Sequence, residues 1–387
     1  MSDHPRVFRF AMAALVFAVL LSAAYSYADK RYRRLNQEKY TPKLQWIDTV
    51  MAREKQWILE NQGDDGEIYM NGRHPGDINP YFACHAALGL LESTADRTVS
   101  DAELQSVRRY LNWHTEQHLA SGGQMGTYRK QETAFVRTGK TDSMDAYLGA
   151  YLELLGAYLE ITQSAEGLLC WQDGIRMAVD TLRKLNDSGL TAVSWENDTK
   201  YLMDNLEVWK GLRTLENGLR TLQDSRELSS IRTRADSLRM QMETELPRAF
   251  WNEAAGKWRV IAGSDRFDPN RFYPDGIAQI YPLICGYPAG DVQDQEALYH
   301  AFIRSFHWQT IEEDEKTFVW AMAGMAAVQT GDTETLCSFL KTYESTFAAN
   351  RKYPLYTGEA GWVCRSCAGL HRLYTAQMNR HLFGLFS

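Results

Sequence analysis

Twelve helical stretches follow one another along this chain, and two kinds of stretch alternate. The first of each pair is amphipathic with a charged outer face, whereas the second is apolar or rich in small residues on nearly every side. An amphipathic helix covers a core, but a helix that is apolar all round needs neighbours on every side. Six such pairs, spaced roughly 40 to 70 residues apart, predict an all-α, internally repeated architecture.

Two concentric rings of helices satisfy this alternation, so we expect an (α/α)6 toroid that forms one domain over residues 44–387. The amphipathic, outer stretches are 44–62, 101–119, 167–186, 226–250, 292–308 and 333–347. The inner stretches are 80–92, 143–162, 204–222, 274–285, 316–330 and 359–375.

The connections between these stretches differ in length according to their direction. Those that lead from an outer to an inner stretch are mostly long, whereas those that lead back are short. All the long loops therefore lie at one end of the barrel, where the inner helices begin. Long loops on one face of a rigid scaffold usually carry the function. We expect short β-hairpins within them, one of them turning at Ala255 and Gly256.

The N-terminal segment is apolar from Phe8 to Ala28 and predicts a signal peptide or a signal anchor. Its small-residue ending permits cleavage, and its length permits retention as a membrane span, which takes about 20 residues. A polar connector follows over residues 29–43. The basic residues at 30–34 would hold the domain in the cytoplasm by the positive-inside rule. The charged start and apolar core of the segment favour export, so we expect an extracytoplasmic protein, either secreted or anchored in the inner membrane.

The composition favours sugars as ligands over nucleic acids. The net charge is -7 and the sequence lacks a long basic run, which argues against nucleic acid. Aromatic residues make up 12% of the chain, and their flat rings suit stacking on pyranose faces as well as core packing. We therefore expect a carbohydrate partner.

We expect neither a metal nor a cofactor. The six cysteines are too sparse for a disulfide framework. Cys364, Cys367 and His371 share one helical face at a spacing that suits a metal, but a fourth ligand is not evident. The glycines do not form a phosphate-binding loop.

Acidic residues recur at or near the starts of the inner helices. Each can be explained as a helix cap, and Asp142 with Asp145 three residues later imitates a capping box. Because all of them lie at the same end of the barrel, they also predict a cleft lined by carboxylates. The candidate catalytic residues are Asp77, Asp142, Asp145, Asp204, Glu207 and Asp275, with Glu359 and residues 312–315 at the same end of the barrel.

Cleavage of a glycosidic bond needs one protonated carboxyl group and one ionised one. The two should come from different helices so that they can flank the bond. We expect Asp142 or Asp145 to be the ionised partner and Glu207 or Asp77 to be the proton donor, with Asp275 in reserve. The expected sugar-stacking residues are Tyr69, Tyr81, Tyr128, Trp195, Tyr201, Trp209, Tyr273, Trp320 and Trp362, with Trp258 and Tyr356 nearby.

Two motifs carry a resemblance to a known group of proteins. The paired helices, the T-D-S-M-D-A-Y run at 141–147 and the Y-L-M-D-N-L-E-V-W-K-G-L run at 201–212 resemble the six-hairpin glycosidase-like superfamily of bacterial (α/α)6 toroids, over nearly the whole chain after about residue 43. Asp142 and Asp145 are similar to the aspartate-rich helix start that carries the base in family-8 glycoside hydrolases. The resemblance implies glycan chemistry with inversion at the anomeric carbon.

We therefore expect an exported glycoside hydrolase that acts on a polysaccharide or oligosaccharide, in a setting such as exopolysaccharide synthesis. Three alternatives stay open: a non-catalytic glycan-binding toroid, a polysaccharide lyase or sugar epimerase, and a terpene-cyclase-like toroid suggested by D-S-M-D. A lyase would need a Tyr or His base beside an Arg or Lys that neutralises a uronate.

Overall fold

The computed structural model describes residues 4–72, 76–138, 142–222, 226–288, 294–310, 318–351 and 355–382. Its helices form an inner ring, in which each helix packs on the next and the last packs on the first, and an outer ring whose helices pack on the inner ones, which confirms the (α/α)6 toroid. The outer helices are α1 (His4–Glu60), α3 (Asp101–Ala120), α5 (Leu168–Leu185), α7 (Arg226–Phe250), α9 (Gln295–Phe306) and α11 (Thr333–Tyr343). The inner helices are α2 (Pro80–Leu90), α4 (Met144–Thr162), α6 (Leu202–Arg220), α8 (Ile277–Cys285), α10 (Ala323–Thr330) and α12 (Thr357–Met378).

The inner helices pack closely because glycines face one another across them. A Cβ atom added at Gly211 of α6 would lie 2.2 Å from the carbonyl oxygen of Gly149 in α4, and one added at Gly361 of α12 would lie 2.0 Å from that of His85 in α2. Contacts this short exclude any larger residue. The small residues in the inner stretches therefore set the spacing of the ring and hold the helix starts close together.

Two of the expected inner helices are shorter than the sequence indicates. The stretch 274–285 begins as a π-helical turn, η1 (Phe272–Gly276), before α8. The stretch 316–330 is helical in α10, after a turn at 321–322. Two more short turns, η2 (Trp308–Thr310) and η3 (Glu344–Ala348), follow outer helices. The acids expected at residues 312–315 lie outside the described residues.

The long loops carry small antiparallel sheets. The first sheet contains β1 (Asp77–Ile78), β2 (Tyr128–Gln131) and β3 (Ala134–Arg137), with Asp77 opposite Arg129. A second pairs β4 (Asn186–Asp187) with β5 (Leu190–Thr191), and a third pairs β6 (Trp251–Asn252) with β7 (Lys257–Trp258). The third sheet confirms the hairpin that turns at Ala255 and Gly256.

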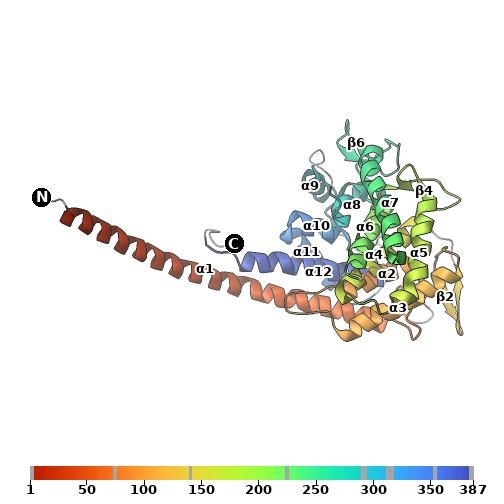
Figure 1. The fold of residues 1–387 in the computed structure, drawn as a ribbon, viewed down its shortest axis with the longest axis horizontal. Helices are drawn as coiled ribbons and strands as arrows, with labels where there is room; N and C mark the ends of the chain where they lie inside the picture. Colours follow the sequence, from red (N-terminus) through yellow and green to blue (C-terminus); the bar gives the residue numbers. More distant parts are fainter. Residues whose placement is uncertain are drawn as a thin grey trace.

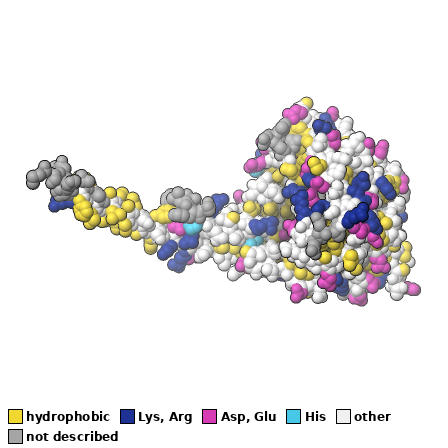
Figure 2. Space-filling view, viewed as in Figure 1, with side chains coloured by type: hydrophobic (Ala, Val, Ile, Leu, Met, Phe, Trp, Pro, Cys, Tyr) yellow, Lys and Arg dark blue, Asp and Glu magenta, His cyan; other side chains and the backbone are white. Residues whose placement is uncertain are grey.

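Helix α1 continues without a break from the N-terminal apolar segment into the barrel (Figure 1). Residues 29–43, expected to be a connector, are therefore helical. The apolar part is long and apolar enough to cross a membrane, and Phe8, Phe10 and Leu20 in it are exposed. Figure 2 shows hydrophobic side chains along this projecting arm, followed by basic ones. This arrangement is consistent with a signal sequence or an anchor.

Candidate active site

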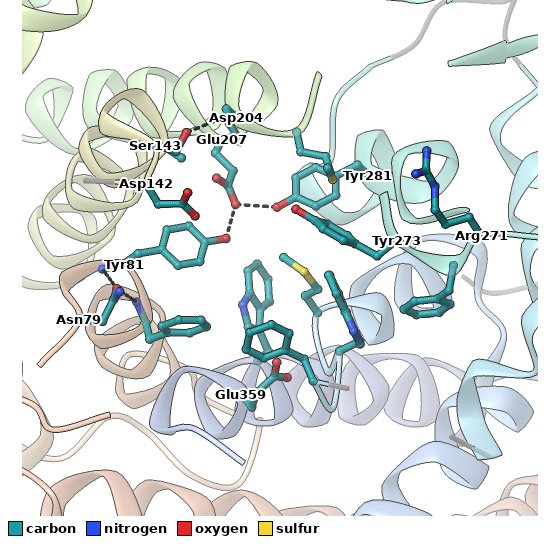
Figure 3. A pocket seen from close by; sticks show the side chains of 18 of the residues that line it. Asn79, Tyr81, Asp142, Ser143, Asp204, Glu207, Arg271, Tyr273, Tyr281 and Glu359 are labelled. Atoms are coloured by element: carbon teal, nitrogen blue, oxygen red, sulfur yellow. Dashed lines mark hydrogen bonds between the residues drawn. The ribbon is translucent and has the colours of Figure 1, made fainter. Parts of the chain in front are cut away.

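A cavity of about 1230 Å³ opens at the end of the barrel where the inner helices begin. The first turns of α2, α4, α6 and α12 line it, together with residues 270–273 before α8 and Phe318, Trp320 and Met322 before α10. Figure 3 shows its side chains converging from all these elements. The long loops and the inner-helix starts therefore meet at one site, as the loop lengths indicate.

One wall of the cavity holds a chain of hydrogen bonds between two aspartates. The hydroxyl of Ser143 lies within hydrogen-bond distance of Oδ1 of Asp145, at 3.0 Å, and of Oδ2 of Asp204. Asp145 also accepts hydrogen bonds from Thr191 Oγ1 and from the backbone N–H of Ala146. The hydroxyl carries a single proton, so both contacts are satisfied only when one carboxyl group is protonated. Asp204 is the better candidate, since Asp145 already accepts two other hydrogen bonds.

The electrostatics of this pair agree with that assignment. Burial, followed by the charges of Asp145 and Glu207, raises the pKa of Asp204 well above its ordinary value. Burial raises the pKa of Asp145 only to about 6, because the hydrogen bonds from Thr191 and Ser143 favour its ionised form. Asp204 lines the cavity, whereas Asp145 is fully buried behind it and outside the lining. Geometry and burial thus both favour the proton on Asp204, which faces the cavity, with Ser143 and Asp145 behind it.

Glu207 lies one helical turn further along α6 and also faces the cavity. Its Oε1 accepts hydrogen bonds from the hydroxyls of Tyr81 and Tyr281, both at 2.6 Å (Figure 3). Burial raises its pKa to about 7, although the two hydroxyls favour the ionised form. Glu207 thus has one oxygen fully engaged with protein donors.

Glu359 lies on the opposite wall from Asp204 and Glu207 (Figure 3). It belongs to the first turn of α12, and its Oε2 accepts a hydrogen bond from the backbone N–H of Ala321 at 2.7 Å. Burial raises its pKa to about 7, while the backbone donors at Ala321 and Trp320 oppose the rise. The positive end of the helix dipole also favours the carboxylate. Carboxyl groups thus face one another across the cavity.

Of the other candidate acids, one lines the cavity and two do not. Asp142 lines the cavity and is exposed. Asp77 is not in the lining: it pairs with Arg129 across β1 and β2, so it does not lie across the funnel as expected. Asp275 is fully buried, accepts the backbone N–H of Asp268 and pairs with Arg271, so it positions an arginine and is not in the lining either.

Four of the nine expected aromatic residues line the cavity: Tyr81, Tyr273, Trp320 and Trp362. The other five do not. Tyr69, Tyr128 and Trp209 are buried in the core, Tyr201 is partly buried against it, and Trp195 is exposed on a loop. Trp258 is buried, and Tyr356 packs on Phe82 and Phe318 at the edge of the cavity.

Sequence reasoning misses several lining residues. Tyr281 lies mid-helix in an apolar stretch, where nothing marks it as different from a core residue. Tyr147, Phe272 and Phe318 add apolar surface, and Phe272 packs edge-on to Trp320. Arg271 brings a guanidinium to the cavity, held by Asp275. Patterns of helical period do not distinguish a ring that faces a cavity from one that faces the core.

Several solved structures with a similar fold are glycosidases. No protein-family model and no curated protein sequence matches this chain. A metal-independent alpha mannosidase from Streptococcus pneumoniae superposes with a TM-score of 0.63 at 11% identity, covering 89% of this chain and 98% of the other. A glycosidase variant in complex with glucose superposes with a TM-score of 0.54 at 14% identity, covering 87% of this chain and 98% of the other. A rhamnosidase from Klebsiella oxytoca with rhamnose bound superposes with a TM-score of 0.55 at 13% identity, covering 86% of this chain and 64% of the other.

Proposed function

We propose that this protein is a glycoside hydrolase, with Asp204 as the general acid and Glu359 as the general base. The observation that carries the proposal is the pair of carboxyl groups on opposite walls of one cavity, each with a pKa raised by burial. Carboxyl groups that flank a bond from two sides are what acid and base catalysis of glycoside cleavage requires. The fold shared with glycosidases supports this choice.

The proton positions give each residue a role. Asp204 would protonate the glycosidic oxygen of the leaving sugar, and the Ser143 hydroxyl could then rotate to donate to the new carboxylate. Glu359 would take a proton from a water molecule as that water attacks the anomeric carbon. The products are two sugars with a new reducing end. The resemblance to inverting toroid enzymes favours inversion.

Glu207 is the second candidate for the proton donor. Its position on α6 and its raised pKa support that role, but both Tyr81 and Tyr281 donate to one of its oxygens. Asp142 is the second candidate for the base, by its likeness to the helix start of family-8 glycoside hydrolases. Single substitutions at these residues distinguish the assignments.

The charge of the cavity supports a neutral glycan as substrate. Four carboxyl groups line it, at Asp142, Asp204, Glu207 and Glu359, and the guanidinium of Arg271 already pairs with Asp275. A uronate would be repelled by each of these groups that is ionised, whereas a neutral sugar would not. The exposed ring of Tyr273 and the ring of Trp320 lie 4.9 Å apart and offer a stacking surface for a sugar.

Lyase activity is a second function that these residues suggest, but the structure supports it less well. Tyr273 and Arg271 are near neighbours, as a Tyr base and a uronate-neutralising arginine would need to be. However, burial and the charges of Asp204 and Asp142 raise the pKa of Tyr273 to about 12, which opposes formation of the phenolate base. Product analysis separates the two, because a lyase leaves an unsaturated sugar end and a hydrolase does not.

The location of the enzyme is part of the proposal. The N-terminal apolar helix supports export, with the barrel outside the cytoplasm and either anchored or released, in a setting such as exopolysaccharide synthesis. The test is a phosphatase reporter fused after residue 387 that is active only outside the cytoplasm. Reporter fusions that show the C-terminus in the cytoplasm would reverse the assignment.

A further inference from the structure

A second group of polar side chains lies at the end of the barrel away from the cavity, where the inner helices finish. Asp48 comes from α1, Asp96 from the turn between α2 and α3, and His371 from α12. One oxygen of each aspartate and a ring nitrogen of the histidine lie within 4.8 Å of one another. Three segments far apart in the sequence thus bring three atoms that bind metals to one point.

The histidine nitrogen in this group has no other use in the described part of the structure. His371 is 1% exposed, and its Nε2 has no hydrogen-bond partner among the described residues. It lies 3.8 Å from Oδ2 of Asp48 and 3.7 Å from Oδ2 of Asp96. These separations are too long for hydrogen bonds. Two atoms bound to one zinc ion in tetrahedral geometry lie roughly 3.3 to 3.6 Å apart, so the two separations from Nε2 are slightly longer than those in an occupied site.

Neighbouring hydroxyls orient two of these three groups. Nδ1 of His371 lies 3.3 Å from Oγ1 of Thr375, and Thr94 Oγ1 donates a hydrogen bond to Oδ1 of Asp48 at 3.0 Å. If Nδ1 carries the proton and donates it to Thr375, the Nε2 lone pair points at the two carboxylates. A lone pair facing two anions is unfavourable unless a cation or a proton lies between them.

We propose that Asp48, Asp96 and His371 bind one Zn²⁺ ion, with water completing its coordination. A nitrogen ligand and two carboxylates suit zinc, whereas Mg²⁺ and Ca²⁺ prefer sets made of oxygen atoms alone. The sequence groups His371 with Cys364 and Cys367, but both thiols are buried apart from this cluster. The ion would connect α1 to α12 at the base of the barrel, so its role is structural and separate from the cavity.

Asp96 makes the proposal testable without disturbing the fold, because its side chain is 73% exposed. The full chain, purified in detergent without a histidine tag and stripped by chelator, is titrated with Zn²⁺ in a calorimeter. We expect one equivalent to bind and to raise the melting temperature. Asp96→Asn and His371→Gln should each weaken binding at least about tenfold. Asp198→Asn, an exposed aspartate on a distant loop, should bind as wild type does.

Two results would overturn the proposal. One is the absence of saturable uptake at one equivalent. The other is uptake that Asp96→Asn leaves unchanged, which would place the ion elsewhere. Because Asp96→Asn keeps the fold, failure of His371→Gln to fold would not obscure the answer. Glycan cleavage does not enter either measurement, so the zinc site and the hydrolase proposal can fail separately.

Discussion

The backbone N–H of Ala321 donates a hydrogen bond to Oε2 of Glu359 at 2.7 Å, and this contact fixes an acid that faces the α4 and α6 wall from the far side of the cavity. Ala321 precedes α10 and Glu359 lies in the first turn of α12, so the bond joins two inner-helix starts. The backbone donor at Trp320 acts on the same carboxylate. The position of Glu359 therefore follows from backbone geometry, which a change of its side chain to an amide would preserve.

The first prediction concerns Glu359. Glu359→Gln should lower kcat by about 10² to 10⁴-fold, because an amide cannot accept the proton of the attacking water. The melting temperature should stay near that of wild type, since Gln Oε1 can still accept the hydrogen bond from Ala321. Steady-state kinetics and a thermal melt check both. Unchanged turnover with an early melt would make Glu359 a helix cap and no base.

The second prediction distinguishes Asp204 from Glu207 as the proton donor. Asp204→Asn should abolish cleavage of an unactivated glycan but spare much of the rate with a dinitrophenyl glycoside, whose leaving group needs no protonation. Glu207→Gln should lower both rates by similar factors, as expected of a residue that positions substrate. If the two variants show the opposite pattern, Glu207 is the donor.

The third prediction is a shift of the pH profile. The rate should fall with rising pH as Asp204 loses its proton, and burial and the charge of Asp145 raise that pKa. Asp145→Asn removes the charge, so the high-pH limb should move to lower pH. The low-pH limb, set by Glu359 with a pKa of about 7, should not move. A profile unchanged on both limbs would contradict the coupling through Ser143.

The fourth prediction concerns stability. Glu207 has a folded pKa of about 7 against an ordinary value of 4.5, so the folded state holds its proton more tightly than the unfolded chain does. Its contribution is fully present below about pH 4.5 and is lost as the pH rises through 7. As the pH rises from 5 to 8, the free energy of unfolding of Glu207→Gln should therefore increase by on the order of 1 to 3 kcal/mol relative to that of wild type. Denaturant unfolding of both proteins at pH 5 and pH 8 measures this difference. The prediction is refuted if the unfolding free energies of the two proteins change equally between the two pH values.

The fifth prediction tests sugar stacking with a matched pair of exposed rings. Tyr273 lines the cavity and is 52% exposed, whereas Trp195 is 46% exposed on a loop outside it. Tyr273→Ala should raise KM about fivefold, since a stacking contact is worth about 1 kcal/mol. Trp195→Ala should leave KM unchanged. Equal effects of the two substitutions would remove Tyr273 from the binding surface.

The fold follows from the sequence because the helical periods, the glycines and the loop lengths all indicate the same toroid. The ring of acids at the inner-helix starts is also visible there. The sequence does not indicate which of these acids face one another across the cavity. Asp77 looks like a funnel residue, yet the register of β1 and β2 places it against Arg129. Glu359 is grouped with the other acids but not singled out, because its separation of 155 positions from Asp204 along the chain says nothing about their meeting across a cavity.

The most direct test of the central claim is product analysis on a panel of neutral and uronic polysaccharides, with wild type and Glu359→Gln in parallel. The proposal predicts new reducing ends from a neutral glycan with wild type, no unsaturated sugar, and no products with the variant. An unsaturated, ultraviolet-absorbing end from a uronic glycan would identify a lyase. Binding without products from any member of the panel would identify a glycan-binding protein and contradict the hydrolase.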